Sequence, residues 1–62
     1  MDLPEVARDT EVAEFIGVSP ASLAQDRHRG RGIPYVRIGR RIRYLRSDVL
    51  AHLAENRVGG AA

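Results

Sequence analysis

The sequence predicts a small α+β domain in which two short helices are followed by a two-stranded β-hairpin and a C-terminal helix. Three observations favour this class. Apolar residues recur at helical spacing up to about residue 29, change to a period of two in the stretches 35–38 and 41–44, and return to helical spacing after residue 47. Because the chain has only 62 residues, we expect one domain over 1–62, with a lead-in at 1–8 and a frayed tail at 58–62.

The first predicted helix follows the lead-in. Asp9 or Thr10 can cap it, and Gly17 ends it. Its apolar stripe consists of Val12, Ala13, Phe15 and Ile16.

The second predicted helix has the clearest start signal in the chain. Ser19 is an N-cap residue type, and Pro20 falls at the first helical position, where a missing N–H costs nothing. We expect this helix to run from about Pro20 to Arg29 and to be closed by Gly30. Since only three residues separate the two helices and one is glycine, they form a helix-turn-helix.

The alternating segment after the Gly- and Arg-rich loop predicts a hairpin. A two-residue loop at Gly39-Arg40 would pair Ile38 with Arg41 and place charges on a buried face. A loop of three residues, Gly39 to Arg41, leaves one apolar and one cationic face, so we favour it. It pairs Ile38 with Ile42, Val36 with Tyr44 and Arg37 with Arg43.

The third predicted helix starts after Ser47, which can cap it, and ends near Arg57. Its expected inward stripe consists of Val49, Leu50, Leu53 and Ala54. With the hairpin as a wing, the predicted fold is a winged helix-turn-helix.

The charges are segregated along the chain. All ten basic residues are arginine. Residues 1–26 hold one arginine against six acids, a net charge of −5, whereas residues 27–46 hold eight arginines and no acid, a net charge of +8. A solvated surface normally mixes both signs, so this cationic block indicates a polyanionic partner.

A helix-turn-helix with a basic hairpin suits double-stranded DNA, because the second helix can enter the major groove while the hairpin reaches the adjacent minor groove or backbone. The helix positions opposite inward Leu23 are the expected reading face, although Gln25 can also be read as an ordinary solvated residue. We expect Arg27 to pair with Asp26 or an acid of the first helix. The candidate DNA contacts are Ala21, Ser22, Gln25, His28 and Arg29 on the helix, Arg31 in the loop, and Arg37, Arg40, Arg41 and Arg43 in the wing.

Other functions lack the residues they need. The two histidines lie in different predicted helices, the carboxylates are scattered, and there is no cysteine, so we expect no catalytic residue, metal site, cofactor or small-molecule ligand. We expect His52 to be a packing residue. No apolar run is long enough to cross a membrane, and the acidic start lacks the features of a signal peptide, so we expect a cytoplasmic protein.

Three blocks in order, Glu11 to Leu23, Gly30 to Tyr44 and Ser47 to Leu53, resemble the excisionase-like, MerR-type winged helix-turn-helix domains of phages and mobile elements. The resemblance covers about residues 9–55 and implies DNA contacts from Ser22, Gln25, His28 and Arg40. The chain departs from the family at Asp26 and His52, where aromatic residues are usual. An ion pair from Asp26 to Arg27, Arg29 or a wing arginine would compensate for the smaller core.

The resemblance implies an accessory role. MerR-type regulators carry a long dimerisation helix and an effector domain, and the 62-residue sequence shows neither. We therefore expect an excisionase, or recombination directionality factor, that binds adjacent sites beside copies of itself, bends attachment-site DNA and directs an integrase toward excision in a bacterial host. The alternatives are a small phage transcription regulator and, from another class, a protein-binding adaptor or antitoxin.

Overall fold

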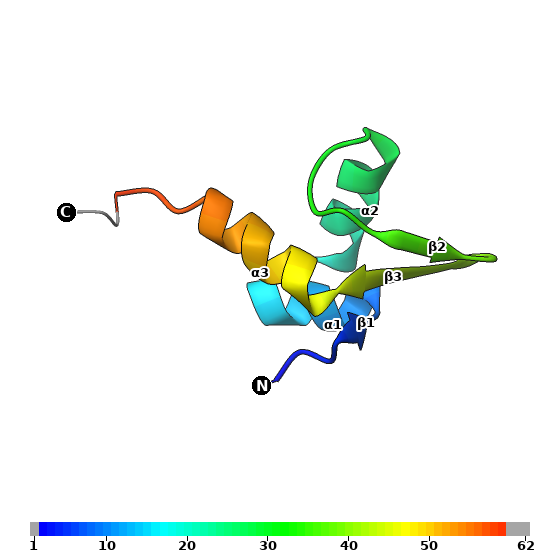
Figure 1. The fold of residues 1–62 in the computed structure, drawn as a ribbon. Coiled ribbons are helices and arrows are strands. Elements are labelled where there is room, and N and C mark those ends of the chain that lie inside the picture. The colour runs from blue at the N-terminus through cyan, green and yellow to red at the C-terminus, as the bar shows by residue number, and fades with distance from the viewer. Residues whose placement is uncertain (1, 60–62) are drawn as a thin grey trace.

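The computed structural model describes residues 2–59 and confirms the predicted fold class, a winged helix-turn-helix. The helix-turn-helix packs against one side of a small sheet, and the hairpin projects from the body on the side away from the C-terminal helix (Figure 1). The elements in chain order are β1 (Val6–Ala7), α1 (Asp9–Ile16), α2 (Pro20–His28), β2 (Val36–Ile38), β3 (Arg41–Leu45) and α3 (Arg46–Glu55).

The predicted lead-in contributes to the sheet and to the core. Strand β1 pairs antiparallel with β3, so the sheet has the order β1-β3-β2 with β3 at its centre. Leu3 is buried, and Ala7 has no exposed surface. The predicted lead-in at 1–8 thus contains a strand that the sequence did not indicate, because a strand of two residues is too short to show a period of two.

The helix-turn-helix follows its local signals closely. The Ser19 side chain accepts a hydrogen bond of 3.1 Å from the Ser22 backbone N–H, and α2 begins at Pro20 as predicted. Gly17 ends α1 in the left-handed conformation, with φ of 80°. The start of α1 differs from the prediction, because Arg8 occupies the cap position and its backbone N–H is bound by the Glu11 carboxylate at 2.9 Å.

The hairpin has the register that we did not favour. Ile38 pairs with Arg41, Arg37 with Ile42 and Val36 with Arg43, across a two-residue loop at Gly39-Arg40. Gly39 has φ of 62° and stands first in the loop, as type II′ turns require, and such turns match the twist of the strands. The predicted three-residue loop is wrong because it assumed that one whole face of the hairpin is buried.

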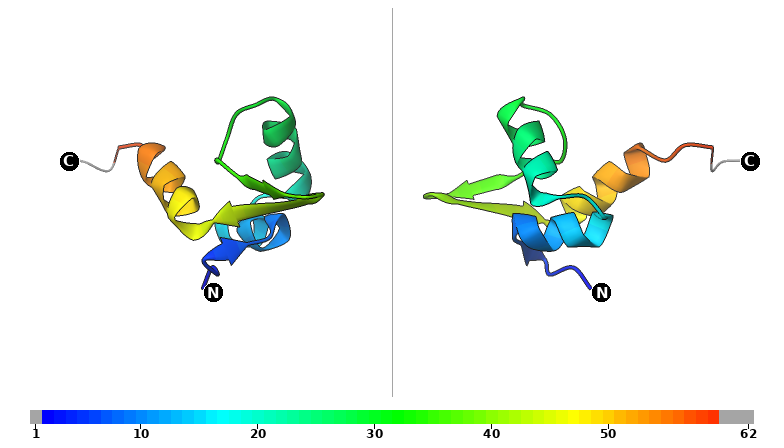
Figure 2. Two further views of the ribbon diagram at one scale, coloured as in Figure 1. Left: turned by 45° about the vertical axis from the view of Figure 1, so that its right-hand side comes forward. Right: turned by 180° about the vertical axis from the view of Figure 1, so that it is seen from behind.

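The observed position of the hairpin explains this outcome. The hairpin extends beyond the helices into solvent (Figure 2), so the body covers only the inner part of one face. Tyr44 is buried and Ile42 half-buried there, whereas Ile38 near the tip is 57% exposed. Each face therefore mixes apolar and cationic residues: Arg37 shares the face of Ile42 and Tyr44, and the other face carries Val36, Ile38, Arg41 and Arg43.

Helix α3 also differs from the prediction. It starts directly after β3 with Leu45, rather than Ser47, at the cap position, and it ends at Glu55. Only Val49 of the expected stripe is buried, while Leu50 is 47% exposed and Leu53 39% exposed. Figures 1 and 2 show the reason, since α3 leads away from the body and no further element covers it.

The C-terminal tail lies largely outside the description. Of the predicted frayed tail at 58–62, residues 60–62 lie outside the described residues. Val58 is almost fully exposed.

The core is small and is centred on Tyr44. The Tyr44 hydroxyl accepts a hydrogen bond of 2.9 Å from Arg27 Nη1, and Arg27 Nη2 lies 4.0 Å from the Asp9 carboxylate. The expected ion pair between Arg27 and an acid of the first helix is confirmed. The buried residues come from every element except β2: Leu3, Ala7, Val12, Ala13, Leu23, Ile33, Tyr44 and Val49.

Replacement of Tyr44 by phenylalanine should destabilise the protein. The substitution removes the hydroxyl that binds Arg27 and keeps the buried ring, and a hydrogen bond to a charged group contributes about 1.5 kcal/mol or more. We expect a fall of that size in the free energy of unfolding, measured by urea denaturation. Tyr35→Phe is the matched control, because Tyr35 is partly exposed; equal losses in the two variants would contradict the role of the Tyr44 hydroxyl.

Candidate nucleic-acid interface

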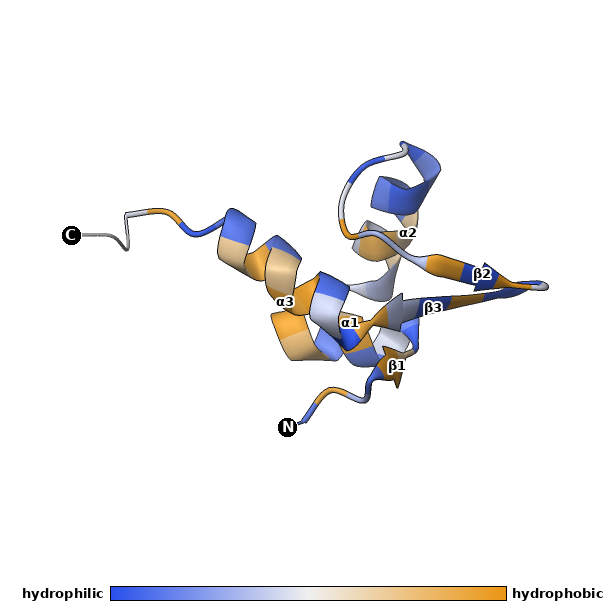
Figure 3. Ribbon diagram, in the orientation of Figure 1, coloured by the Kyte–Doolittle hydropathy of each residue, from blue (hydrophilic) through white to orange (hydrophobic). Residues whose placement is uncertain are grey.

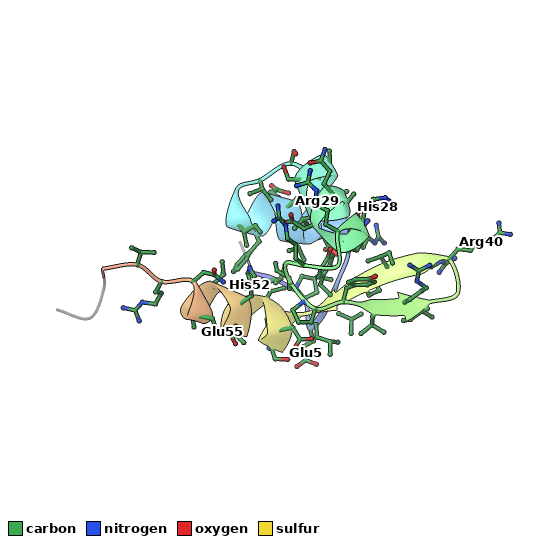
Figure 4. All side chains as sticks on the ribbon, turned by 90° about the horizontal axis from the view of Figure 1, so that it is seen from above. Glu5, His28, Arg29, Arg40, His52 and Glu55 are labelled. Carbon is green, nitrogen blue, oxygen red and sulfur yellow. The ribbon has the colours of Figure 1, made fainter. Side chains whose placement is uncertain are left out.

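The outer face of α2 is polar and open to solvent. Leu23 points into the core and is the only buried residue of this helix. The residues predicted to read DNA are all exposed on the remaining surface: Ala21, Ser22, Gln25, His28 and Arg29. Figure 4 shows His28 and Arg29 at the C-terminal end of α2. Their exposure leaves these side chains accessible to DNA, and their contact with DNA stays a prediction.

The side chains of this face have different surroundings at the two ends of α2. Ser22 belongs to the helix cap, since its hydroxyl lies 3.0 Å from the Ser19 hydroxyl. Gln25, His28 and Arg29 line a shallow hollow with Ala24. The last turn of α2 thus offers a hydrogen-bonding amide, an imidazole and a guanidinium side by side, which are donors suited to base edges and phosphates.

The wing carries its arginines on different sides. Arg40 lies at the tip and reaches furthest from the body (Figure 4). The prediction that Arg37 and Arg43 share an outer face is wrong, because the two-residue loop places Arg37 on the side of α2 and Arg43 on the opposite side together with Arg41. Arg43 is half-buried and donates a hydrogen bond of 2.8 Å to the Ile42 carbonyl.

The loop between α2 and β2 is held by Asp26. Its carboxylate lies 3.7 Å from Arg31 Nε, and its backbone carbonyl accepts from the Arg31 N–H at 2.9 Å. The expected compensating ion pair therefore exists, but its partner is Arg31 rather than Arg27, Arg29 or a wing arginine. The Arg31 side chain remains 66% exposed, so it retains free surface for a phosphate.

Acidic residues are few at this surface, where α2 contributes Asp26 and its carboxylate pairs with Arg31. Figure 3 shows a ribbon that is mostly hydrophilic over the last turn of α2, the following loop and the tip of the hairpin. No acid occurs between residues 27 and 46, and Asp9 and Glu5 pair with Arg27 and Arg46 behind it. The cationic block predicted from the sequence therefore divides into arginines paired with N-terminal acids, Arg27 and Arg46, and the exposed arginines of the loop and the wing.

One residue of this surface was missed in the sequence. Tyr35 precedes β2 and lines an open crevice together with Ala24, Arg27, His28 and Arg37. Its ring centroid lies 6.3 Å from that of Tyr44, and the Arg27 guanidinium lies 6.0 Å from the Tyr35 centroid. The sequence shows Tyr35 as an aromatic residue at the start of a basic hairpin. Its position beside α2 could not be predicted, because it depends on how the hairpin packs against the helix.

Other kinds of site are not found in the described residues. Within 2–59, no group of three or more His, Asp or Glu side chains is placed to hold a metal ion. No helix in the same range has the length and apolarity needed to cross a membrane. His52 is half-buried on α3, far from His28 (Figure 4).

The fold and this surface define a winged helix-turn-helix domain of the DNA-binding class. The comparison with protein families agrees, since residues 9–57 match the model of a family described as "Helix-turn-helix domain". The chain belongs to this family, which supports DNA binding as its function. No curated protein and no solved structure matches the chain.

The loop that carries Arg31 should depend on a glycine at position 32. Gly32 and Gly30 both have positive φ, 93° and 70°, which costs other residues about 1–2 kcal/mol. Only at Gly32 would an added Cβ also lie 2.9 Å from the Asp26 Cβ. We expect Gly32→Ala to lower the free energy of unfolding more than Gly30→Ala in urea denaturation; equal losses would contradict the contact with Asp26.

Proposed function

We propose that the protein binds double-stranded DNA, with α2 in the major groove and the tip of the wing in the adjacent minor groove. One observation supports this arrangement above the others: from residue 27 to residue 46, which covers the end of α2, the following loop and the wing, the chain has no acid, and His28, Arg29 and Arg40 are exposed there. Gln25 is suited to adenine and Arg29 to guanine or a phosphate, while Arg40 suits a narrow minor groove. We assign backbone contacts to Arg31 and Arg41, both of which are exposed. No step in this role requires catalysis.

Gln25→Ala and Arg40→Ala should each weaken DNA binding without unfolding the protein. Both side chains are exposed and make no contact with the core, so the thermal midpoint should stay unchanged. Loss of a base contact costs about 1–3 kcal/mol. Fluorescence anisotropy with a labelled duplex measures the affinity, and Glu55→Ala on the far helix is a control. If neither variant binds more weakly, the docking arrangement is wrong.

We further propose an architectural role as an excisionase. A module with one reading helix and one wing buries about 600–1,000 Å² of its surface on DNA, which limits its specificity. Binding to adjacent sites beside copies of itself, or beside an integrase, adds the missing affinity because each neighbour raises the effective concentration of the next contact. The protein would then bend phage attachment-site DNA in the bacterial cytoplasm and direct the integrase toward excision.

Two experiments test the architectural role. In a mobility-shift assay on an attachment region, several adjacent sites should give a ladder of shifted bands as the protein concentration rises. An excision assay with the cognate integrase should show more product when the protein is present. A single shifted band at saturation and no effect on excision would refute this role, and binding restricted to a promoter would instead indicate a small transcription regulator.

A further inference from the structure

An open crevice lies at the junction between α2 and the wing. It is lined by Ala24, Arg27 and His28 from the helix and by Tyr35 and Arg37 from the start of the hairpin. Figure 1 shows why these residues meet, since the chain leaves the end of α2, passes through the loop and returns beneath the helix as β2. The crevice therefore joins the element proposed for the major groove to the element proposed for the minor groove.

The floor of the crevice is fixed and its mouth is cationic. Arg27 is held by Tyr44 and Asp9, and its guanidinium lies 6.0 Å from the centroid of the Tyr35 ring. Arg37 is exposed, and the hairpin register places it on the face that α2 covers. His28 is exposed at the other edge. No acidic side chain lines the crevice.

The geometry of duplex DNA indicates what such a crevice meets. The major and minor grooves are separated on each side by a sugar–phosphate backbone. A body whose helix enters one groove while its hairpin enters the next must straddle that backbone, and the part that straddles it is the junction between the two elements.

The helix itself cannot hold an anion here. The crevice lies beside the last turn of α2, where the helix dipole is negative and backbone N–H groups point away. A phosphate at this place has to be bound by side chains. Arg37 offers a planar set of donors and His28 a ring N–H, and both types of donor bind phosphate oxygens well.

We propose that this crevice clamps one backbone phosphate of the bound duplex, with Arg37 and His28 as its two donors and the Tyr35 ring as its wall. The inference rests on the proposed DNA binding and adds a specific site to it. It assigns different roles to arginines that the sequence presents as equivalent: Arg37 binds the phosphate between the grooves, Arg40 reaches into the minor groove, and Arg43, on the opposite face of the wing, does not contribute to the clamp.

The salt dependence of binding tests the clamp. Each phosphate neutralised by a cation lowers the logarithm of the binding constant by about 0.9 per tenfold rise in salt, so titrations of a labelled duplex of mixed sequence between about 50 and 200 mM NaCl count such contacts. We expect Arg37→Ala to reduce the slope by about 0.9 and to weaken binding about tenfold, equally for duplexes of different sequence. Arg57→Ala is the matched control, since it removes the same charge from an exposed position beyond α3, and its slope should stay close to that of the parent protein.

A double-mutant cycle tests whether His28 shares the same phosphate. His28→Ala alone should weaken DNA binding. The double variant with Arg37→Ala and His28→Ala should lose less affinity than the product of the two single losses, because both donors bind the same phosphate. Circular dichroism of all variants checks that they fold, as expected for Arg37 and His28 because both are exposed.

The outcomes separate this inference from the proposed function. If Arg40→Ala weakens binding but Arg37→Ala leaves the slope unchanged, the clamp is wrong and DNA binding stands. If Arg37→Ala and Arg57→Ala lower the slope equally, the protein binds DNA through its net charge alone and the clamp is also wrong. If the parent protein and all variants bind no duplex at low salt, the proposed function fails.

Discussion

The contact between the Arg27 guanidinium and the Tyr44 hydroxyl determines how the helix-turn-helix sits on the sheet. Helix α2 places a single apolar side chain, Leu23, in the core, which is too little to fix the angle of a nine-residue helix by packing alone. The hydrogen bond of 2.9 Å joins α2 to the central strand, and the ion pair with Asp9 joins the same guanidinium to α1. One arginine therefore orients both helices relative to the hairpin.

This arrangement gives the two charge blocks of the sequence distinct roles. The acidic N-terminal block supplies Asp9 to the internal arginine and Glu5 to Arg46, and thereby stabilises the side of the molecule that faces away from the proposed DNA. Arg29, directly after α2, and the wing arginines Arg37, Arg40, Arg41 and Arg43 come from the segment that contains no acid. The net charge of +2 therefore hides an uneven distribution of cations over the molecule.

Local signals predicted the helix-turn-helix because its determinants lie within a few residues of one another. Gly17, Ser19 and Pro20 define the turn, and the spacing from Leu23 identifies the exposed face. The hairpin register could not be predicted in the same way, since it depends on how much of the hairpin the body covers. Strand β1 and the start of α3 were missed for a related reason. Pairing with β3 fixes β1, which is too short to show an alternation, and α3 follows β3 directly without a capping side chain.

The pairing of Tyr35 with Tyr44 has a spectroscopic consequence. The chain contains two tyrosines and no tryptophan, and both phenol rings lie where α2 meets the wing. The tyrosine emission of the unmodified protein therefore originates entirely at this junction. One ring is buried and bonded to a guanidinium, whereas the other is partly exposed, so the two residues differ in their access to a quencher. The protein thus contains its own optical reporter at the point where its helix and its hairpin join.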